Sequence, residues 1–161
     1  MSKLNVDQKA IIDLLSDKKA DFLIPDYQRP YAWSEEQCQT LWDDIFLFSF
    51  PDNNYEAFDD NEEYFLGSIV TYKNENGKSE VIDGQQRLTT LMLILRAFYD
   101  KFESMKDKNS ILTRDRIEKC IWKTDTFGTA DKNTLKIDSE VATDNDKDEF
   151  LDLLLLQHGF P

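Results

Sequence analysis

The residues best suited to chemistry in this 161-residue chain lie in one short polar turn, residues 83–87. The turn follows two β-branched residues, Val81 and Ile82, and precedes an apolar run over residues 88–95. This pattern predicts a buried strand, a turn at Gly84 and a buried helix. The free N–H groups at such a helix start, together with the helix dipole, favour an anion. The turn therefore has the chemistry of a phosphate-binding site.

Arg87 is the side chain of this turn that is best suited to contact phosphate. Its guanidinium is planar, permanently charged and able to bind two phosphate oxygens. It also lies near the positive end of the predicted helix dipole, and a nearby anion would resolve that conflict. The alternative is a structural salt bridge between Arg87 and one of the many carboxylates of the chain.

Asp83 and Gln86 have both a functional and a structural interpretation. Their spacing is that of an N-cap residue and its N3 partner, so the two side chains are expected to form a capping box if their role is structural. Gln85 has no such structural explanation, and we expect its polar side chain to contribute to the site. For Asp83 and Gln86, both interpretations are open.

A second informative stretch covers residues 24–33, where Pro25 and Pro30 bracket Gln28 and Arg29. The prolines favour extended conformations in the residues that precede them. Three aromatic residues are interleaved with these polar ones: Tyr27, Tyr31 and Trp33. Rigid aromatic rings beside Arg and Gln suit stacking on a base and hydrogen bonding to its edge or phosphate. The alternative is that the aromatic rings seal the core beneath a proline-rich loop.

Apolar periodicity predicts the elements that position these two stretches. Helices are expected at residues 35–48, 88–102 and 111–122, with a short helix starting near Asn5 and a last helix starting at Asp144. Strands are expected at residues 22–24, 64–72, 79–83 and 135–137, and a loop at 124–133. Together these elements predict a single domain over residues 1–161 with a mixed α/β (α+β) fold.

Residues 64–83 predict a β-hairpin, with the Asn-Gly pair at residues 76–77 as its two-residue turn. This register places Lys73 opposite Glu80, a pair of opposite charge. Gly67 interrupts the first strand, and either a bulge or the close approach of a ligand would explain a glycine there.

The composition limits the kinds of partner. The chain has 19 basic and 32 acidic residues and a net charge of −13, which opposes binding to nucleic acid through a broad basic face. Any phosphate contact must therefore be local. The single histidine, His158, excludes a histidine-rich metal site within this chain, and Cys38 and Cys120 are expected to be reduced, buried thiols. We expect a cytoplasmic protein with no signal peptide and no membrane partner.

The end of the chain suggests a continuation. Residues 153–156 are all leucine, and the predicted last helix that carries them has little to pack against. We therefore expect the chain to be the N-terminal part of a longer protein.

Three segments together resemble the N-terminal domain of GmrSD-type modification-dependent restriction enzymes, a branch of the ParB and sulfiredoxin-like superfamily. They are IPDYQRPYAW, FLGSIV and VIDGQQRLTTL, and the resemblance is strongest over residues 22–102. It implies a ParB-like mixed sheet, with a β-hairpin leading into a buried helix and with flanking helices. It also implies nucleoside-triphosphate binding and hydrolysis at the DGQQR turn, coupled to defence against modified foreign DNA.

The resemblance also implies roles for individual residues. The nucleotide or its phosphates would be bound by Tyr27, Gln28, Arg29, Gly84, Gln85, Gln86 and Arg87. The catalytic residues would be Asp83, Gln85 and Arg87, with Asp83 on Mg²⁺ or a water molecule. DNA would be contacted through the full-length protein or a partner nuclease domain. Two other functions are open: a ParB-like DNA-binding or DNA-nicking domain, and a module that senses a nucleotide without hydrolysing it.

Overall fold

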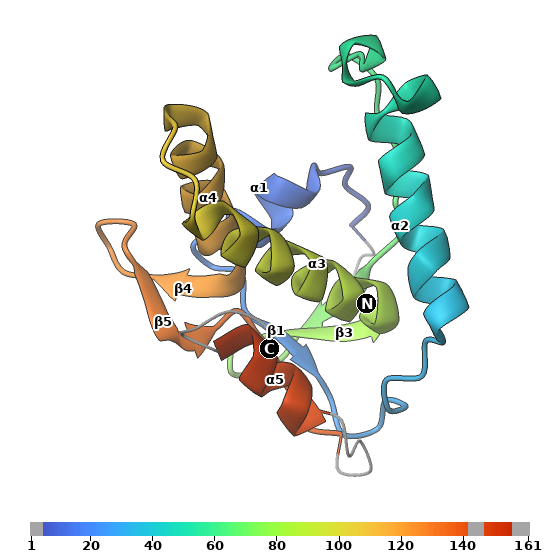
Figure 1. Ribbon diagram of the computed structural model, residues 1–161. Helices are drawn as coiled ribbons and strands as arrows, with labels where there is room; N and C mark the ends of the chain where they lie inside the picture. The colour runs from blue at the N-terminus through green and yellow to red at the C-terminus, as the bar shows by residue number, and fades with distance from the viewer. Residues whose placement is uncertain (1–4, 142–146, 156–161) are drawn as a thin grey trace.

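A four-stranded mixed sheet lies at the centre of the molecule, seen in Figure 1. The structure is a computed structural model that describes residues 5–141 and 147–155. The strands of the sheet are β1 (Phe22–Ile24), β2 (Val70–Lys73), β3 (Ser79–Asp83) and β6 (Ile137–Ser139), in the order β2-β3-β1-β6. Strand β1 is parallel to both β3 and β6, and β2 is antiparallel to β3. Three neighbouring strands therefore have their carboxyl ends at the same edge.

The described residues form five α-helices, and most of the helix bounds match the predicted ones. The helices are α1 (Ile11–Ser16), α2 (Glu35–Ser49), α3 (Gln85–Glu103), α4 (Lys108–Ile121) and α5 (Lys147–Leu155), with two short 3-10 helices, η1 (Pro51–Asn53) and η2 (Tyr55–Ala57). The mixed α/β fold, with a hairpin leading into a buried helix, is confirmed. The predicted start near Asn5 is wrong, because α1 begins after Ala10 without a side-chain cap.

Helix α3 crosses the sheet and forms the centre of the main hydrophobic core (Figure 1). Leu88 and Met92 of α3 are fully buried against Phe22, Ile24 and other apolar residues of the sheet. Leu154 of α5 is also fully buried in this cluster. The expectation that the last helix has little to pack against is therefore wrong. The predicted helix start at Asp144 lies outside the described residues.

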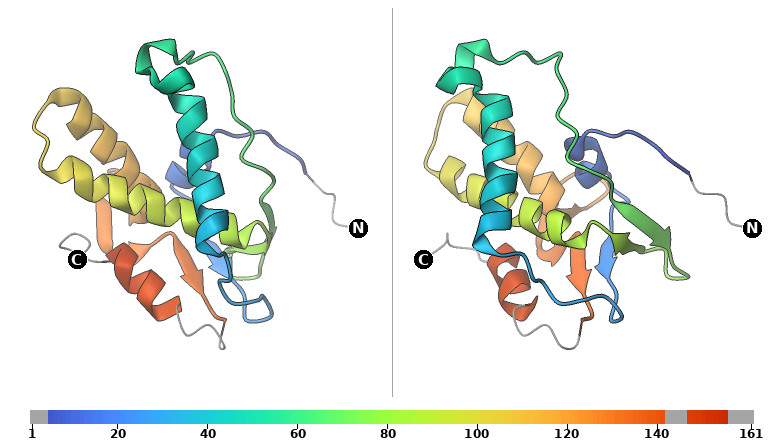
Figure 2. Two further views of the ribbon diagram at one scale, coloured as in Figure 1. Left: turned by 45° about the vertical axis from the view of Figure 1, so that its right-hand side comes forward. Right: turned by 90° about the vertical axis from the view of Figure 1, so that its right-hand side faces the viewer.

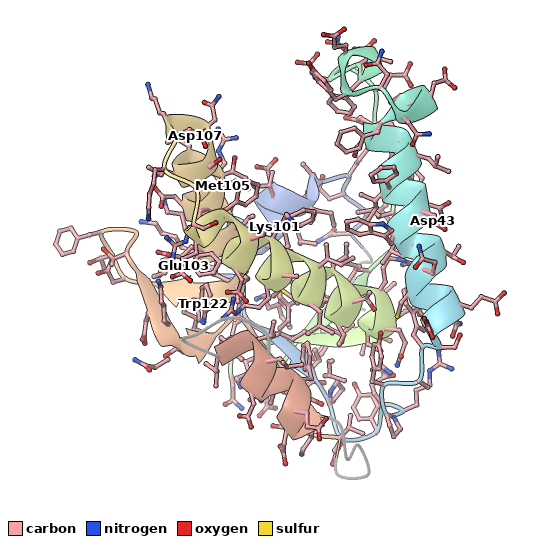
Figure 3. The ribbon with its side chains drawn as sticks, in the orientation of Figure 1. Asp43, Lys101, Glu103, Met105, Asp107 and Trp122 are labelled. Atoms are coloured by element: carbon pink, nitrogen blue, oxygen red, sulfur yellow. The ribbon has the colours of Figure 1, made fainter. Side chains whose placement is uncertain are left out.

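A smaller apolar cluster joins α3 to α4 and to a separate two-stranded sheet. Trp122 is the fully buried centre of this cluster, and its ring meets that of Tyr99 edge to face at 5.0 Å. Figure 3 shows Trp122 beneath the hairpin of α3 and α4, whose turn carries Glu103, Met105 and Asp107. The cluster fixes the C-terminal end of α3, so the N-terminal end of this helix belongs to an element that is held in place along its length.

The two-stranded sheet corrects the predicted loop at residues 124–133. Strand β4 (Trp122–Thr124) pairs antiparallel with β5 (Ala130–Leu135). The turn between them is built on Asp125, whose Oδ1 accepts hydrogen bonds from the N–H groups of Phe127 and Thr129. The four central residues of β5 are polar, and three of them are exposed, so its sequence lacks the apolar alternation that marks a half-buried strand.

The hairpin of β2 and β3 has a different register from the predicted one. Lys73 pairs with Ser79, so Glu80 faces Tyr72 instead. The reason is a longer connection, closed by a hydrogen bond from the N–H of Asn74 to the carbonyl oxygen of Lys78 at 3.0 Å. The first strand is also shorter than predicted, because β2 covers only Val70–Lys73.

Helix α2 stands beside the main body, as Figure 2 shows. Leu41 is its only buried residue, and the Trp42 ring stacks on Phe98 of α3 with the ring centroids 6.0 Å apart. Figure 3 shows Asp43 on the same helix. Cys38 of α2 and Cys120 of α4 are both free thiols as predicted, and Cys120 is buried, whereas Cys38 is only half-buried. Within residues 5–141 and 147–155, no helix is both long enough and apolar enough to cross a membrane.

Candidate functional site

The two polar stretches meet at the carboxyl ends of neighbouring parallel strands. Strand β1 ends at Ile24 and leads into the proline-rich loop, and β3 ends at Asp83 and leads into α3. Because β1 and β3 are adjacent and parallel, both segments leave the sheet at the same edge. Ligand sites of open α/β sheets lie characteristically at this edge. The prediction that the two stretches lie close together is confirmed.

Gln85 and Gln86 connect α3 to the proline-rich loop. The Gln85 Nε2 donates to the carbonyl oxygen of Arg29 at 2.8 Å. The Gln86 Nε2 donates to the carbonyl oxygen of Pro30 at 3.2 Å, and its Oε1 accepts from the N–H of Ala32 at 2.7 Å. Both glutamines are buried. Their amides therefore hold the loop against the first turn of the helix.

Gln28 connects the same loop to β3. Its Nε2 donates to the carbonyl oxygen of Ile82 at 3.2 Å. Tyr27 is 64% exposed, and its hydroxyl donates to the Glu80 carboxylate at 3.2 Å. Tyr27 braces the outside of the loop, whereas Gln28 faces the helix start.

The start of α3 is a glycine cap. Gly84 is the N-cap residue with φ of +87°, and α3 has no side-chain cap at this end. The proposed capping box of Asp83 and Gln86 is therefore wrong, because Gln86 binds the loop and Asp83 is exposed. A Cβ on Gly84 would lie 2.9 Å from the carbonyl oxygen of Ser68. Both the positive φ and the tight contact require glycine here.

Arg87 lies on the segment that leads into β2. Its Nη1 donates to the carbonyl oxygen of Ser68 at 3.1 Å. Gly67 has φ of +100°, and a Cβ there would lie 2.7 Å from the Arg87 Cζ. Among the described residues, no carboxylate forms a salt bridge with Arg87. The alternative interpretation, a structural salt bridge from Arg87 to a carboxylate, is therefore wrong for the described residues. The Arg87 side chain also explains the glycine at position 67, because it fills the space that a side chain there would need.

A cavity of about 290 Å³ opens between these segments, and we call it the turn cavity. It is lined by Gln28, Arg29, Trp33, Ile82, Asp83, Gly84, Gln85, Gln86 and Arg87. Two guanidinium groups and one carboxylate give the lining a local positive charge in a protein of net charge −13. The Arg29 side chain has no hydrogen bond or ion pair to any described residue. The cavity is therefore lined by two guanidinium groups: that of Arg29, which has no partner among the described residues, and that of Arg87, which the carbonyl oxygen of Ser68 holds in place.

The backbone adds hydrogen-bond donors to the turn cavity. The first hydrogen bond of α3 runs from the N–H of Leu88 to the carbonyl oxygen of Gly84 at 2.9 Å. The N–H groups of residues 85–87 consequently have no partner within the helix. With the positive end of the helix dipole, these donors favour an anion. Guanidinium groups and backbone donors together form the recognition chemistry of a phosphate chain.

A second cavity, of about 280 Å³, lies between α3 and α5, and we call it the α3–α5 cavity. It is lined by Ile24, Arg29, Tyr31, Gln85, Gln86, Thr89, Leu93, Ser139, Lys147, Glu149, Phe150 and Leu153. Arg29, Gln85 and Gln86 also line the turn cavity, so the two cavities are neighbours. This cavity could not be predicted from the sequence, because the apolar periodicity of α5 does not show which helix α5 faces.

Tyr31 fixes the end of the proline-rich loop. Its hydroxyl forms hydrogen bonds with Thr90 Oγ1 at 2.9 Å and Cys38 Sγ at 3.2 Å. Burial, followed by the hydrogen bond with Cys38, raises the pKa of Tyr31 to about 12. This hydroxyl joins the loop to both α2 and α3. Trp33, expected to seal the core, is half-buried and lines the turn cavity.

Asp83 is the one carboxylate among the described residues that line the turn cavity. Within the described ranges, no group of three or more His, Cys, Asp or Glu residues is arranged to hold a metal ion. A metal ion bound by protein ligands alone would need such a group, whereas Mg²⁺ in nucleotide sites is held by one or two carboxylates and the phosphates. Asp83 fits the second kind of site.

The fold is a mixed α/β domain with two neighbouring cavities at the carboxyl edge of its parallel strands. The profile of the family described as GmrSD restriction endonuclease, N-terminal domain, matches residues 11–157. The chain therefore belongs to this family, which confirms the resemblance found in its sequence. A comparison with curated proteins found no match.

Proposed function

We propose that this domain binds the phosphates of a nucleoside triphosphate in the turn cavity and hydrolyses the nucleotide. The observation that carries the proposal is that one cavity is lined by Arg29, Arg87 and the first turn of α3, whose N–H groups at residues 85–87 have no hydrogen-bond partner among the described residues. A cavity with two arginines is notable in this chain, because the excess of 32 acidic over 19 basic residues repels anions overall. A phosphate chain fits both the charge and the donors.

Each residue of the turn contributes in a different way. Arg87 binds phosphate oxygens with the guanidinium edge that Ser68 does not use, and Arg29 does so from the opposite segment. Gln85 uses its side-chain donor on the Arg29 carbonyl, so its phosphate contact comes from its backbone N–H. Gly84 allows close approach to the backbone, and Gln28 and Gln86 hold the loop in place.

Asp83 would hold Mg²⁺ together with the phosphates or orient the attacking water. Bound Mg²⁺ would neutralise charge that develops on the transferred phosphoryl group. Asp83 is exposed at the end of β3 and makes no cap hydrogen bond, so it is free for either role. Its position next to Gly84 brings its charge to the phosphate-binding backbone.

Membership of a restriction-enzyme family supports a role in defence against modified foreign DNA. We propose that the domain is the N-terminal part of a longer cytoplasmic protein and that DNA is contacted through the rest of that protein or a partner nuclease. A direct DNA-nicking role for this domain is less well supported, because the local cationic site stands in a strongly acidic chain. A nucleotide sensor without hydrolysis would use the same residues apart from Asp83.

The proposal is tested by incubating the protein with each labelled nucleoside triphosphate, with and without Mg²⁺. Binding and phosphate release are measured separately. Binding with Mg²⁺-dependent release supports the hydrolase. Binding without release supports the sensor, and absence of binding to every nucleotide contradicts both.

A further inference from the structure

The α3–α5 cavity differs chemically from the turn cavity beside it. Four of its lining residues are aliphatic or phenyl side chains: Ile24, Leu93, Phe150 and Leu153. The turn cavity, in contrast, is lined mainly by charged and amide side chains. A nucleotide likewise has a charged part and an apolar part, because its phosphates are anionic and its base is a flat ring system with apolar faces.

Size supports a ligand that occupies both cavities. The cavities have volumes of about 280 and 290 Å³. Small-molecule sites begin at roughly 300 Å³, so each cavity alone is at the lower end of the range. A nucleoside triphosphate combines a base, a sugar and three phosphates. Arg29, Gln85 and Gln86 form a wall common to both cavities, so the two cavities lie next to each other.

A buried acceptor in this common wall indicates the polar chemistry of the ligand. Gln85 is only 6% exposed, and its Nε2 donates to the carbonyl oxygen of Arg29. This bond fixes the orientation of the amide and leaves Oε1 as a buried acceptor without a partner among the described residues. An acceptor left in this state is costly, by about 1–3 kcal/mol. Phosphate oxygens are themselves acceptors, so they cannot satisfy it, whereas a ring or exocyclic N–H of a base can.

We propose that the α3–α5 cavity binds the base of the nucleotide, with an N–H group on the edge of the base donating to the Gln85 Oε1. This inference rests on the proposed function, because the phosphates of the same molecule occupy the turn cavity. The aromatic rings of Tyr31 and Phe150 and the side chain of Leu153 provide the apolar contacts to the base. Glu149 adds a second acceptor to the wall of the cavity.

The test compares the four common nucleoside triphosphates with inorganic tripolyphosphate, which has the phosphates but no base. Their affinities are measured by titration calorimetry on the wild-type protein and on Leu153→Trp, which fills the α3–α5 cavity from α5. Asp152→Trp is the matched control, because it adds the same side chain at an exposed position of the same helix. Leu153→Phe is a milder variant in case the larger side chain prevents folding, which melting temperatures report.

We expect the wild-type protein to bind at least one nucleotide about tenfold or more tightly than tripolyphosphate, equivalent to about 1.4 kcal/mol. Leu153→Trp should lose this preference and keep its affinity for tripolyphosphate, and Asp152→Trp should keep both. Equal wild-type affinities, or a preference that survives in both Leu153 variants, would overturn the base site and leave the phosphate site standing. If neither nucleotides nor tripolyphosphate bind, the proposed function fails, and the base site fails with it.

Discussion

The guanidinium of Arg87 lies against the backbone of Gly67, where a Cβ would be only 2.7 Å from the Arg87 Cζ. The two residues belong to different sides of the site, one on α3 and one on the segment before β2. The missing side chain of Gly67 makes room for the cation, and the carbonyl oxygen of Ser68 holds it at 3.1 Å. A cation is thus kept near the positive end of a helix dipole without a salt bridge to any described carboxylate.

Gly67→Ala should weaken nucleotide binding through this contact. The new Cβ displaces the Arg87 guanidinium and also strains a backbone with φ of +100°. Gly77→Ala is the matched control, since Gly77 has φ of +78° and open space around it. Both variants should lose about 1–2 kcal/mol of stability from the backbone alone. Only Gly67→Ala should lose affinity in a nucleotide titration, and equal affinities in the two variants would contradict this role of Gly67.

Gln86→Glu should destabilise the domain. The substitution removes the donor to the carbonyl oxygen of Pro30 and places a charge at a position that is 6% exposed. We expect a loss of about 1–3 kcal/mol in the free energy of unfolding, measured by urea denaturation. Gln37→Glu is the control, because Glu also serves as the N3 partner in the capping box of α2. Equal stability of the two variants would show that the Gln86 amide does not hold the loop.

Tyr31 should make stability depend on alkaline pH. Its folded pKa of about 12 lies above the ordinary value of 10, so ionisation at high pH favours the unfolded chain. The stability that Tyr31 supplies is complete below pH 10 and is lost between pH 10 and 12. The advantage of the wild type over Tyr31→Phe should therefore shrink over that range, by at most about 1.4 kcal/mol per pH unit. Parallel profiles from urea denaturation at each pH would contradict the raised pKa.

The sequence predicted the strand, turn and helix around residues 81–88 because the signals for these elements are local. One continuous segment contains Val81, Gly84 and Leu88. The β-branched residue indicates a strand, the glycine a turn, and the apolar run from Leu88 a buried helix. The prediction of a capping box at Asp83 and Gln86 is wrong, because the same spacing also fits side chains that bind other partners. The glycine at position 84 takes the N-cap with φ of +87°, which leaves the Gln86 amide for the loop.

The parts that the sequence did not predict depend on distant residues. Nothing in the short strand Phe22–Ile24 shows that it pairs in parallel with both β3 and β6. The α3–α5 cavity depends on α5 returning to the sheet, which the position of Leu154 in the main core reveals only in three dimensions. The hairpin register was missed because Asn74 closes a longer connection than the Asn-Gly pair suggests.

Asp83→Asn should separate hydrolysis from binding. Gly84 is the N-cap residue and Asp83 is exposed, so the substitution should change stability by no more than about 0.5 kcal/mol. Phosphate release should be abolished if Asp83 holds Mg²⁺ or orients water, while binding through Arg87 and the backbone persists. Asp26→Asn removes an equal charge from the same region outside the cavity and should keep its turnover. Turnover in Asp83→Asn at the wild-type rate would defeat the catalytic role of Asp83.

The affinity of Arg87→Ala for nucleoside triphosphate tests the central claim most directly. The comparison is with Arg116→Ala, which removes the same charge from an exposed position of α4 outside both cavities. Loss of a charge-assisted phosphate contact should cost about 1.5–3 kcal/mol, a roughly ten- to hundredfold loss of affinity, with an unchanged melting temperature. Arg116→Ala should bind as the wild type does. Equal affinities of the two variants, or a loss in Arg87→Ala that its unfolding explains, would contradict a phosphate site at the start of α3.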